Sequence, residues 1–220
     1  MKAGDRVQYF MTPAQEKKRA FTQIYADGNV IVVDKESGVS SEAVFAELSR
    51  QGECHFIHRL DRNTEGLMIF ARTEDAEREL LSCFRERRAE KIYHALVLGK
   101  MPDRHATCEA YLEKDEKRAK VRILEKPAGE KIVTEYEVLE ERGELSLLQV
   151  TLHTGKTHQI RAHLAYLGHP VIGDEKYGNS AENKRFHATR QRLLSKQLTL
   201  NSDGALSYLK GKIFVSLKNL

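Results

Sequence analysis

Several features that place a chain in a special class are scarce in this sequence. Its 220 residues hold three cysteines, Cys54, Cys83 and Cys108, and no two of them have CxxC spacing. An odd number with this spacing indicates neither a disulfide framework nor a cysteine zinc site. Four prolines and 14 glycines are too few for a collagen-like or disordered chain. We therefore expect a globular protein in a reducing compartment, the cytoplasm.

Long apolar runs are also missing. The longest, residues 67–71, has five residues, whereas a helix that crosses a bilayer needs about 20. The charged N-terminal residues lack the apolar segment of a signal peptide. Membrane spanning and secretion are thus excluded as default interpretations, and we expect a monomer that has no membrane partner.

Positive charge is concentrated in one part of the chain. The net charge is +4, and residues 151–192 alone carry seven basic and three acidic residues, together with five of the nine histidines. Such a basic segment favours a polyanionic partner such as RNA, because neutralised phosphates supply affinity that does not depend on sequence. A solvated basic face explains the same count equally well.

Hydrophobic patterning predicts an α+β fold with a largely antiparallel sheet, because strand and hairpin signals outnumber βαβ crossovers. We expect helices at residues 41–50, 73–88 and 157–167. We expect strands at residues 30–33, 67–72, 91–98, 133–140, 145–152, 197–200, 205–209 and 213–217, with further short strands between 106 and 125. Residues 133–152 read as a hairpin around the turn at 141–144.

The first residues stand apart from this pattern. Residues 1–10 (MKAGDRVQYF) read as one strand with a Gly-Asp turn, and a charged connector without apolar periodicity follows. A lone strand cannot bury itself. We therefore expect residues 1–19 to be a strand and connector outside the main domain, which spans 20–220.

Two segments carry the polar residues that could perform chemistry. In residues 56–72, Asp61 lies in a loop of ionisable residues between two apolar runs, where catalytic groups concentrate. Spacing alone favours a structural carboxylate tied to Arg59 or Arg62 over a catalytic one. In residues 153–164, a strand end runs into a helix N-terminus, which can bind an anion.

Two motifs in the second segment are incomplete. Gly155-Lys156-Thr157 matches the end of a phosphate-binding P-loop, but Val150 stands where that motif needs its first glycine. His158 and His163 are five residues apart, so they do not share a helix face as a zinc-binding HExxH pair does. Nucleoside triphosphate hydrolysis and a zinc site are therefore poor interpretations.

Together, three blocks decide among these alternatives. They are HRLD at residues 58–61 followed by Thr64, Gly66 and Leu67; KIYHALV at 91–97; and TGKTHQIRAHL at 154–164 with GHPVIGD at 168–174. In this order and spacing the chain resembles the RluA-type RNA pseudouridine synthases over residues 24–177. Residues 1–10 resemble the last strand of the small S4-like RNA-binding domain that precedes the catalytic domain in many members.

The resemblance implies the pseudouridine synthase fold and isomerisation of a uridine in folded ribosomal or transfer RNA, with no metal and no organic cofactor. It assigns Asp61 as a nucleophile that attacks either the anomeric carbon of the sugar or carbon 6 of the base. It assigns Arg161 as the partner that keeps Asp61 ionised, and Tyr93 as the aromatic residue that stacks on the flipped base and helps to remove the proton from carbon 5. Arg59 would fill the gap that the base leaves.

The remaining expected contacts to RNA are residues near these blocks or in the basic segment. They are Arg62, Lys156, Thr157, His158, Gln159, Lys184, Arg185, Arg190 and Arg192. The chain departs from the family pattern at Glu65, where serine is usual, in DKESG at 34–38, where NKPAG is usual, and near 193–195, where LHA is usual. These departures lie beside the nucleophile and bear on substrate choice more than on reaction type.

Two other functions stay open at this point. A non-catalytic RNA-binding or assembly factor could keep the same fold and basic groove, although binding alone needs no buried nucleophile. A metal-dependent nuclease or hydrolase would need clustered histidine and carboxylate ligands.

Overall fold

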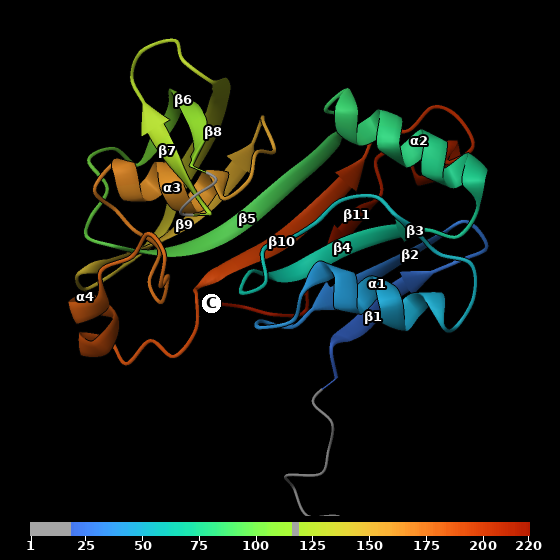
Figure 1. Ribbon diagram of the computed structural model, residues 1–220, viewed down its shortest axis with the longest axis horizontal. Helices are drawn as coiled ribbons and strands as arrows, with labels where there is room; N and C mark the ends of the chain where they lie inside the picture. Colours follow the sequence, from blue (N-terminus) through green and yellow to red (C-terminus); the bar gives the residue numbers. More distant parts are fainter. Residues whose placement is uncertain (1–18, 116–118) are drawn as a thin grey trace, which may run out of the picture.

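A computed structural model describes residues 19–115 and 119–220 of the chain, whose strands form one 11-stranded sheet (Figure 1). Its strands are β1 (Phe21–Ala26), β2 (Val30–Lys35), β3 (His55–Phe56), β4 (Glu65–Ala71), β5 (Ala89–Leu98), β6 (His105–Asp115), β7 (Lys120–Leu124), β8 (Glu130–Arg142), β9 (Leu145–Leu152), β10 (Leu193–Leu200) and β11 (Ile213–Val215). The helices are α1 (Ser41–Ser49), α2 (Glu74–Arg85), α3 (Gln159–Tyr166), α4 (Ser180–Arg185) and the 3-10 helix η3 (Ser207–Leu209). The expected strand at 1–10 and nearly all of the connector lie outside the described residues.

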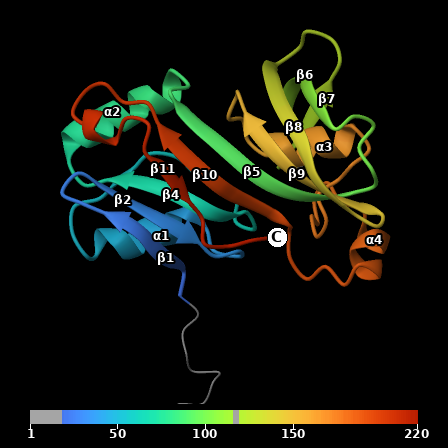
Figure 2. The same ribbon diagram turned by 180° about the vertical axis from the view of Figure 1, so that it is seen from behind.

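The sheet runs in the order β1-β2-β4-β10-β5-β9-β8-β6-β7, with β3 paired to β4 and β11 to β10. Every pair is antiparallel except β10 with β4, which is parallel. The expectation of an α+β fold with a largely antiparallel sheet is confirmed. Seen from behind in Figure 2, β10 and β5 lie side by side and join the half with α1 and α2 to the half with α3.

The central strands of the first half are buried on both faces. Ile31 and Val33 of β2 pack in one apolar cluster with residues of α1, whereas Val30 and Val32 pack in a second cluster with residues of α2. Successive side chains of a strand point to opposite faces, so the two clusters lie on opposite sides of β2. This double burial explains why β2 reads as an unbroken apolar run.

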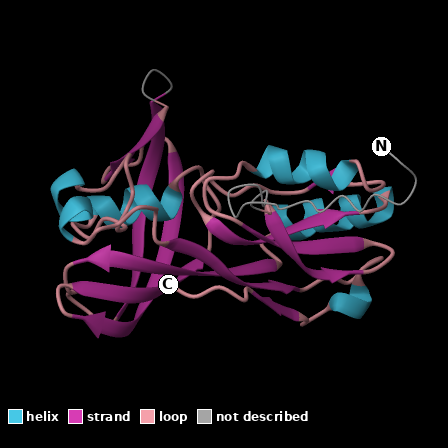
Figure 3. Ribbon diagram, turned by 90° about the horizontal axis from the view of Figure 1, so that it is seen from below, coloured by secondary structure: helices cyan, strands magenta, loops and turns pink. Residues whose placement is uncertain are grey.

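The second half is the arm of the sheet formed by β6 to β9, with α3 packed on it (Figure 3). A third cluster joins Ala162 of α3 to Ala110, Leu112 and Ile132 of the strands. The predicted hairpin at 133–152 is confirmed as β8 and β9. Packing on the arm therefore fixes the position of α3, the helix that carries Arg161.

One predicted strand was wrong, and one helix was not predicted at all. Residues 205–209, expected as a strand, contain the 3-10 helix η3, in which the buried Leu206 and Leu209 are three residues apart, the period of such a turn. The helix α4 was missed because it has no buried residue, and so its sequence carries no apolar periodicity. Its N-terminus is fixed instead by the Asn179 side chain, which accepts hydrogen bonds from the amides of Ala181 and Glu182. No helix among residues 19–115 and 119–220 is both long and apolar enough to cross a membrane.

Gly66 lets β4 approach β10 closely enough for the parallel pairing. Its φ is 110°, and a Cβ atom at this position would lie 2.3 Å from the backbone oxygen of Ser195. Such contact would force the two strands apart, next to the loop that holds Asp61.

We predict that Gly66→Ala lowers the free energy of unfolding by about 2 kcal/mol more than Gly143→Ala does. Gly143 also has a positive φ, 64°, but a Cβ atom added there would meet nothing within 4 Å. The control therefore carries backbone strain without the clash. Urea unfolding of both variants measures the difference, and equal losses would contradict the close approach.

Candidate active site

Asp61 lies in the loop between β3 and β4, and that loop is held from two sides. The Ser41 hydroxyl at the start of α1 donates to the oxygen of Leu60 (2.9 Å) and accepts from its amide (3.0 Å). The fully buried Lys35 at the end of β2 donates to the backbone oxygens of Arg62 (3.0 Å) and Val39 (2.8 Å). Since these contacts flank Asp61 on both sides, its backbone position is fixed.

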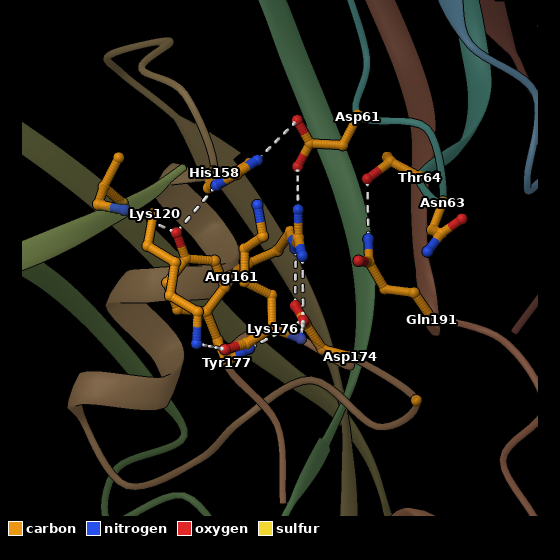
Figure 4. A network of polar contacts seen from close by, with 12 residues as sticks. Asp61, Asn63, Thr64, Lys120, His158, Arg161, Asp174, Lys176, Tyr177 and Gln191 are labelled. Carbon is orange, nitrogen blue, oxygen red and sulfur yellow. Dashed lines mark hydrogen bonds and ion pairs between the residues drawn. The ribbon is translucent and has the colours of Figure 1, made fainter. Parts of the chain in front are cut away.

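Arg161, on the first turn of α3, joins two carboxylates (Figure 4). Its Nη1 donates to Oδ2 of Asp61 at 2.6 Å. On its other side, Nε and Nη2 form a two-point contact with Oδ2 and Oδ1 of Asp174, at 2.6 and 3.0 Å. The planar guanidinium of Arg161 thus holds Asp174 at two points and Asp61, the partner expected from the sequence, at one.

Charge balance keeps the buried pair ionised. Burial by itself would lower the pKa of Arg161, but hydrogen bonds and charge from Asp174 and Asp61 outweigh it and raise that pKa. Burial would raise the pKa of Asp174, yet Arg161 and the amides of Tyr177 and Lys176 lower it below its ordinary value. Asp174 is thus a fixed counter-charge, while the more exposed Asp61 carries the second negative charge.

His158 and Tyr177 close one side of this group. His158 adopts a left-handed backbone conformation with φ 54°, so the helix begins at the next residue, two later than expected. Its Nδ1 lies 2.9 Å from the Tyr177 hydroxyl, and its Nε2 lies 3.8 Å from Oδ1 of Asp61. Burial lowers the pKa of His158 although Asp61 acts to raise it. The Arg161 guanidinium also lies 5.3 Å from the centre of the Tyr177 ring.

Tyr93 lines a cavity with Asp61 and Arg161. About 380 Å³ of empty space lies in the cavity and its opening to solvent, and Thr64 and Leu193 also line it. Tyr93 is only 7% exposed, and burial, with a further contribution from Asp61, raises the pKa of its phenol to about 12. Its hydroxyl is therefore protonated at neutral pH.

Four of the residues expected to contact RNA also line the cavity, namely Arg59, Lys156, His158 and Gln159. Arg59 is 69% exposed at the rim. Gln159 is buried, and its amide bonds inside the protein to Thr154, to the Lys156 amide, to Val133 and to Thr134. Gln159 therefore fastens the loop before α3 to β8, in place of the RNA contact expected from the sequence.

The other expected RNA contacts are more scattered. Arg62, Thr157, Lys184, Arg185 and Arg190 are exposed, and Arg192 is half-buried. Figure 1 places α4, with two of these cations, at the outer edge of the half that carries α3. Several of the cations are already paired. Lys156 contacts Glu130, Arg185 contacts Glu144, and Arg190 contacts Glu65.

Sequence reasoning missed the parts that support Asp61 and Arg161. Asp174 lies in the GHPVIGD block, but its pairing with Arg161 requires residues 13 apart to meet, which no spacing rule predicts. Tyr177 and Lys35 carried no signal beyond their presence near the blocks. Among residues 19–115 and 119–220, no group of three or more His, Cys, Asp or Glu side chains is arranged to hold a metal ion.

Comparisons with a family model and with curated proteins point to the same family. Residues 29–166 match the family model described as RNA pseudouridylate synthase. An uncharacterised RNA pseudouridine synthase of Chloroflexus aurantiacus is 41% identical over 160 residues, 72% of this chain and 49% of that protein. The ribosomal large subunit pseudouridine synthase D of Borreliella burgdorferi is 34% identical over 178 residues, 70% of this chain and 54% of that protein. The chain spans about half the length of these relatives.

Solved structures support the fold. The human RNA pseudouridylate synthase domain containing 1 aligns with a TM-score of 0.75 and 24% identity, over 96% of this chain and 94% of that one. The human RNA pseudouridylate synthase domain containing 4 aligns with a TM-score of 0.69 and 21% identity, over 90% and 88%.

The two carboxylates of Arg161 should differ in their effect on stability. We predict that Asp174→Asn lowers the free energy of unfolding by about 3 to 5 kcal/mol, because it leaves the buried guanidinium without its two-point partner. Asp61→Asn should cost under about 1 kcal/mol, since Asp61 has one contact to Arg161 and a side chain 21% exposed. Chemical denaturation of both variants gives the two values, and a larger loss for Asp61→Asn would contradict this division.

Proposed function

Because the chain belongs to the RNA pseudouridylate synthase family, we propose that it isomerises a uridine in structured RNA to pseudouridine, with Asp61 as the nucleophile. One observation carries this proposal. The Asp61 carboxylate is held at 2.6 Å by Arg161 in a cavity that Tyr93 also lines. A binding surface for RNA would need cations toward phosphates, but it would not need a carboxylate fixed in the lining of a cavity.

The reaction needs the detached uracil to stay inside the cavity until it bonds to the sugar again. Asp61 attacks either the anomeric carbon of the ribose or carbon 6 of the uracil, and the bond between nitrogen 1 and the sugar breaks. The uracil then turns, carbon 5 bonds to the sugar, carbon 5 loses its proton and nitrogen 1 gains one, while the carboxylate is released unchanged. No atom is added, so water must be excluded. A base seated in the cavity would cover the exposed part of Asp61.

The surroundings of Asp61 suit a flipped nucleotide. A uridine within folded RNA reaches the cavity only after leaving its stack, which costs a few kcal/mol that new contacts must offset. The Tyr93 ring offers a stacking surface. Arg59 is exposed at the rim and contacts Glu42 at 3.5 Å, and it would leave this contact to enter the space that the base leaves. With the pKa of Tyr93 raised to about 12, stacking is a better role for this residue than proton removal.

Large-subunit ribosomal RNA is the substrate class that we propose, in preference to transfer RNA. The named relatives, including the ribosomal large subunit pseudouridine synthase C of Vibrio cholerae at 34% identity, carry that assignment in their names. The three cysteines are free thiols, which fits the reducing cytoplasm where such RNA is made. We further propose that the protein acts there as a monomer.

Loss of the nucleophile tests the proposal. We predict that Asp61→Asn lowers pseudouridine formation by more than about 10³-fold, because an amide cannot replace the carboxylate as a nucleophile. Its affinity for RNA should stay within about threefold of wild type. The measurement maps pseudouridine in RNA from cells that lack the protein and are supplied with wild type, with Asp61→Asn, or with Asp75→Asn.

Asp75 is an exposed carboxylate on α2, so Asp75→Asn should modify RNA as wild type does. Comparable pseudouridine levels in the Asp61→Asn cells would remove Asp61 from the mechanism. Identical pseudouridine maps with and without the wild-type protein would overturn the proposed function itself.

A further inference from the structure

Lys91 lies beside the cavity but outside the group of side chains around Asp61. It is two residues before Tyr93 on β5, so both side chains are on the same face of the strand. Its ammonium lies 5.6 Å from the centre of the Phe84 ring at the end of α2. On the other side, a Cβ atom added to Gly155 would lie 3.4 Å from the same ammonium. Lys91 thus lies between α2 and the loop that follows β9.

The figures show where this position is in the fold. In Figure 1 the end of β9 and the loop after it face the C-terminal end of α2 across β5. Gly155 belongs to that loop, next to the cavity-lining residue Lys156. Lys91 does not line the Asp61 cavity but lies next to residues that do, about 7 Å along the strand from Tyr93 at roughly 3.3 Å per residue.

This ammonium is half-buried and lacks a counter-charge. Within the described parts of the chain, Lys91 forms no ion pair and no side-chain hydrogen bond, and the charge that acts on it is that of the exposed Arg87, which also forms no ion pair there. Burial and this positive neighbour lower the pKa of Lys91. The adjacent His58 does not compensate, because burial and Lys91 lower its pKa to about 3 and it stays neutral.

The contrast with the other cations is informative. Lys156, Arg185 and Arg190 each contact a carboxylate, which already balances part of their charge. A half-buried ammonium without such a partner is unfavourable unless an anion approaches it. The backbone of Gly155, which carries no side chain, leaves that approach open.

We propose that Lys91, with Arg87 beside it and Gly155 opposite, binds an RNA backbone phosphate next to the flipped uridine. This inference rests on RNA being the substrate of the Asp61 cavity. The single negative charge of the phosphate would balance the Lys91 ammonium, Arg87 would add attraction, and the contact would hold the RNA strand beside the cavity while the base enters. Lys91 then contributes to binding and register, and the chemical step stays with Asp61.

The salt dependence of RNA binding tests this site. We expect Lys91→Met to lower the slope of log affinity against log salt by about 0.7 to 0.9, the value for one lost phosphate contact. Lys91→Arg should keep the wild-type slope, because it keeps the charge.

Two further variants make the result decisive. Lys100→Met is the control. Lys100 is exposed, contacts Glu141 and follows the end of β5, which is roughly 23 Å from Lys91 at about 3.3 Å per residue. This variant should leave the slope unchanged. Gly155→Asp places a carboxylate within reach of the Lys91 ammonium without altering Lys91. It should lower the slope as Lys91→Met does, and it serves if Lys91→Met fails to fold.

A wild-type slope in Lys91→Met or, should that variant not fold, in Gly155→Asp would overturn the phosphate site. A slope that falls equally in Lys100→Met would overturn it too, since any surface cation would then have the same effect. Because these slopes are measured by binding to a structured RNA, they do not depend on pseudouridine being formed. Failure of the proposed isomerisation is a separate outcome, seen only in the pseudouridine map.

Discussion

The sharing of one guanidinium between two carboxylates is the interaction on which the rest of the site depends. Asp174 takes the two-point contact, is fully buried and receives two backbone amides besides. It therefore fixes the plane of the Arg161 guanidinium, and in this orientation Nη1 points at Asp61. Because the pair is already neutral, a second carboxylate can contact the guanidinium and stay at the edge of the cavity, where a substrate can reach it.

The sheet brings these three residues together from distant parts of the chain. Asp61 comes from the half that carries α1 and α2, whereas Arg161 and Asp174 belong to the half with α3. The strands β10 and β5 pair antiparallel between the two halves, with Ser195 opposite Tyr93. The ion pair between Asp61 and Arg161 spans this junction, so any shift between the halves would separate the carboxylate from its partner.

The sequence predicted the strands that have a clear period and the residues that carry motifs. The continuous apolar run of β2 and the hairpin of β8 and β9 were visible because burial dictates their patterns. The helix α4 and the turn at Leu206 and Leu209 were not, because one has no buried face and the other has a period of three. The resemblance carried by the HRLD block pointed to Asp61, but the block could not show its support by Ser41 and Lys35, which depends on contacts between segments about 20 to 30 residues apart.

The pairing of charged residues also could not be predicted from the sequence. A count of charges in residues 151–192 indicated a basic surface, but it could not show that Lys156, Arg185 and Arg190 are matched with carboxylates. Nor could it single out Lys91, which lies outside that segment. Pairing is a property of the folded chain, so a count of charges along the sequence shows only coarsely which cations stay unpaired.

The most direct test of the shared guanidinium is a comparison of rate and affinity in Arg161→Lys. A lysine ammonium keeps the charge but cannot contact Asp174 at two points and Asp61 at the same time. The account predicts that the single-turnover rate at saturating RNA falls by about 10²-fold or more, as expected when a reacting group is misplaced by about 1 Å. The dissociation constant for RNA should stay within about threefold. Equal losses of rate and affinity would make Arg161 one more phosphate contact and contradict the account.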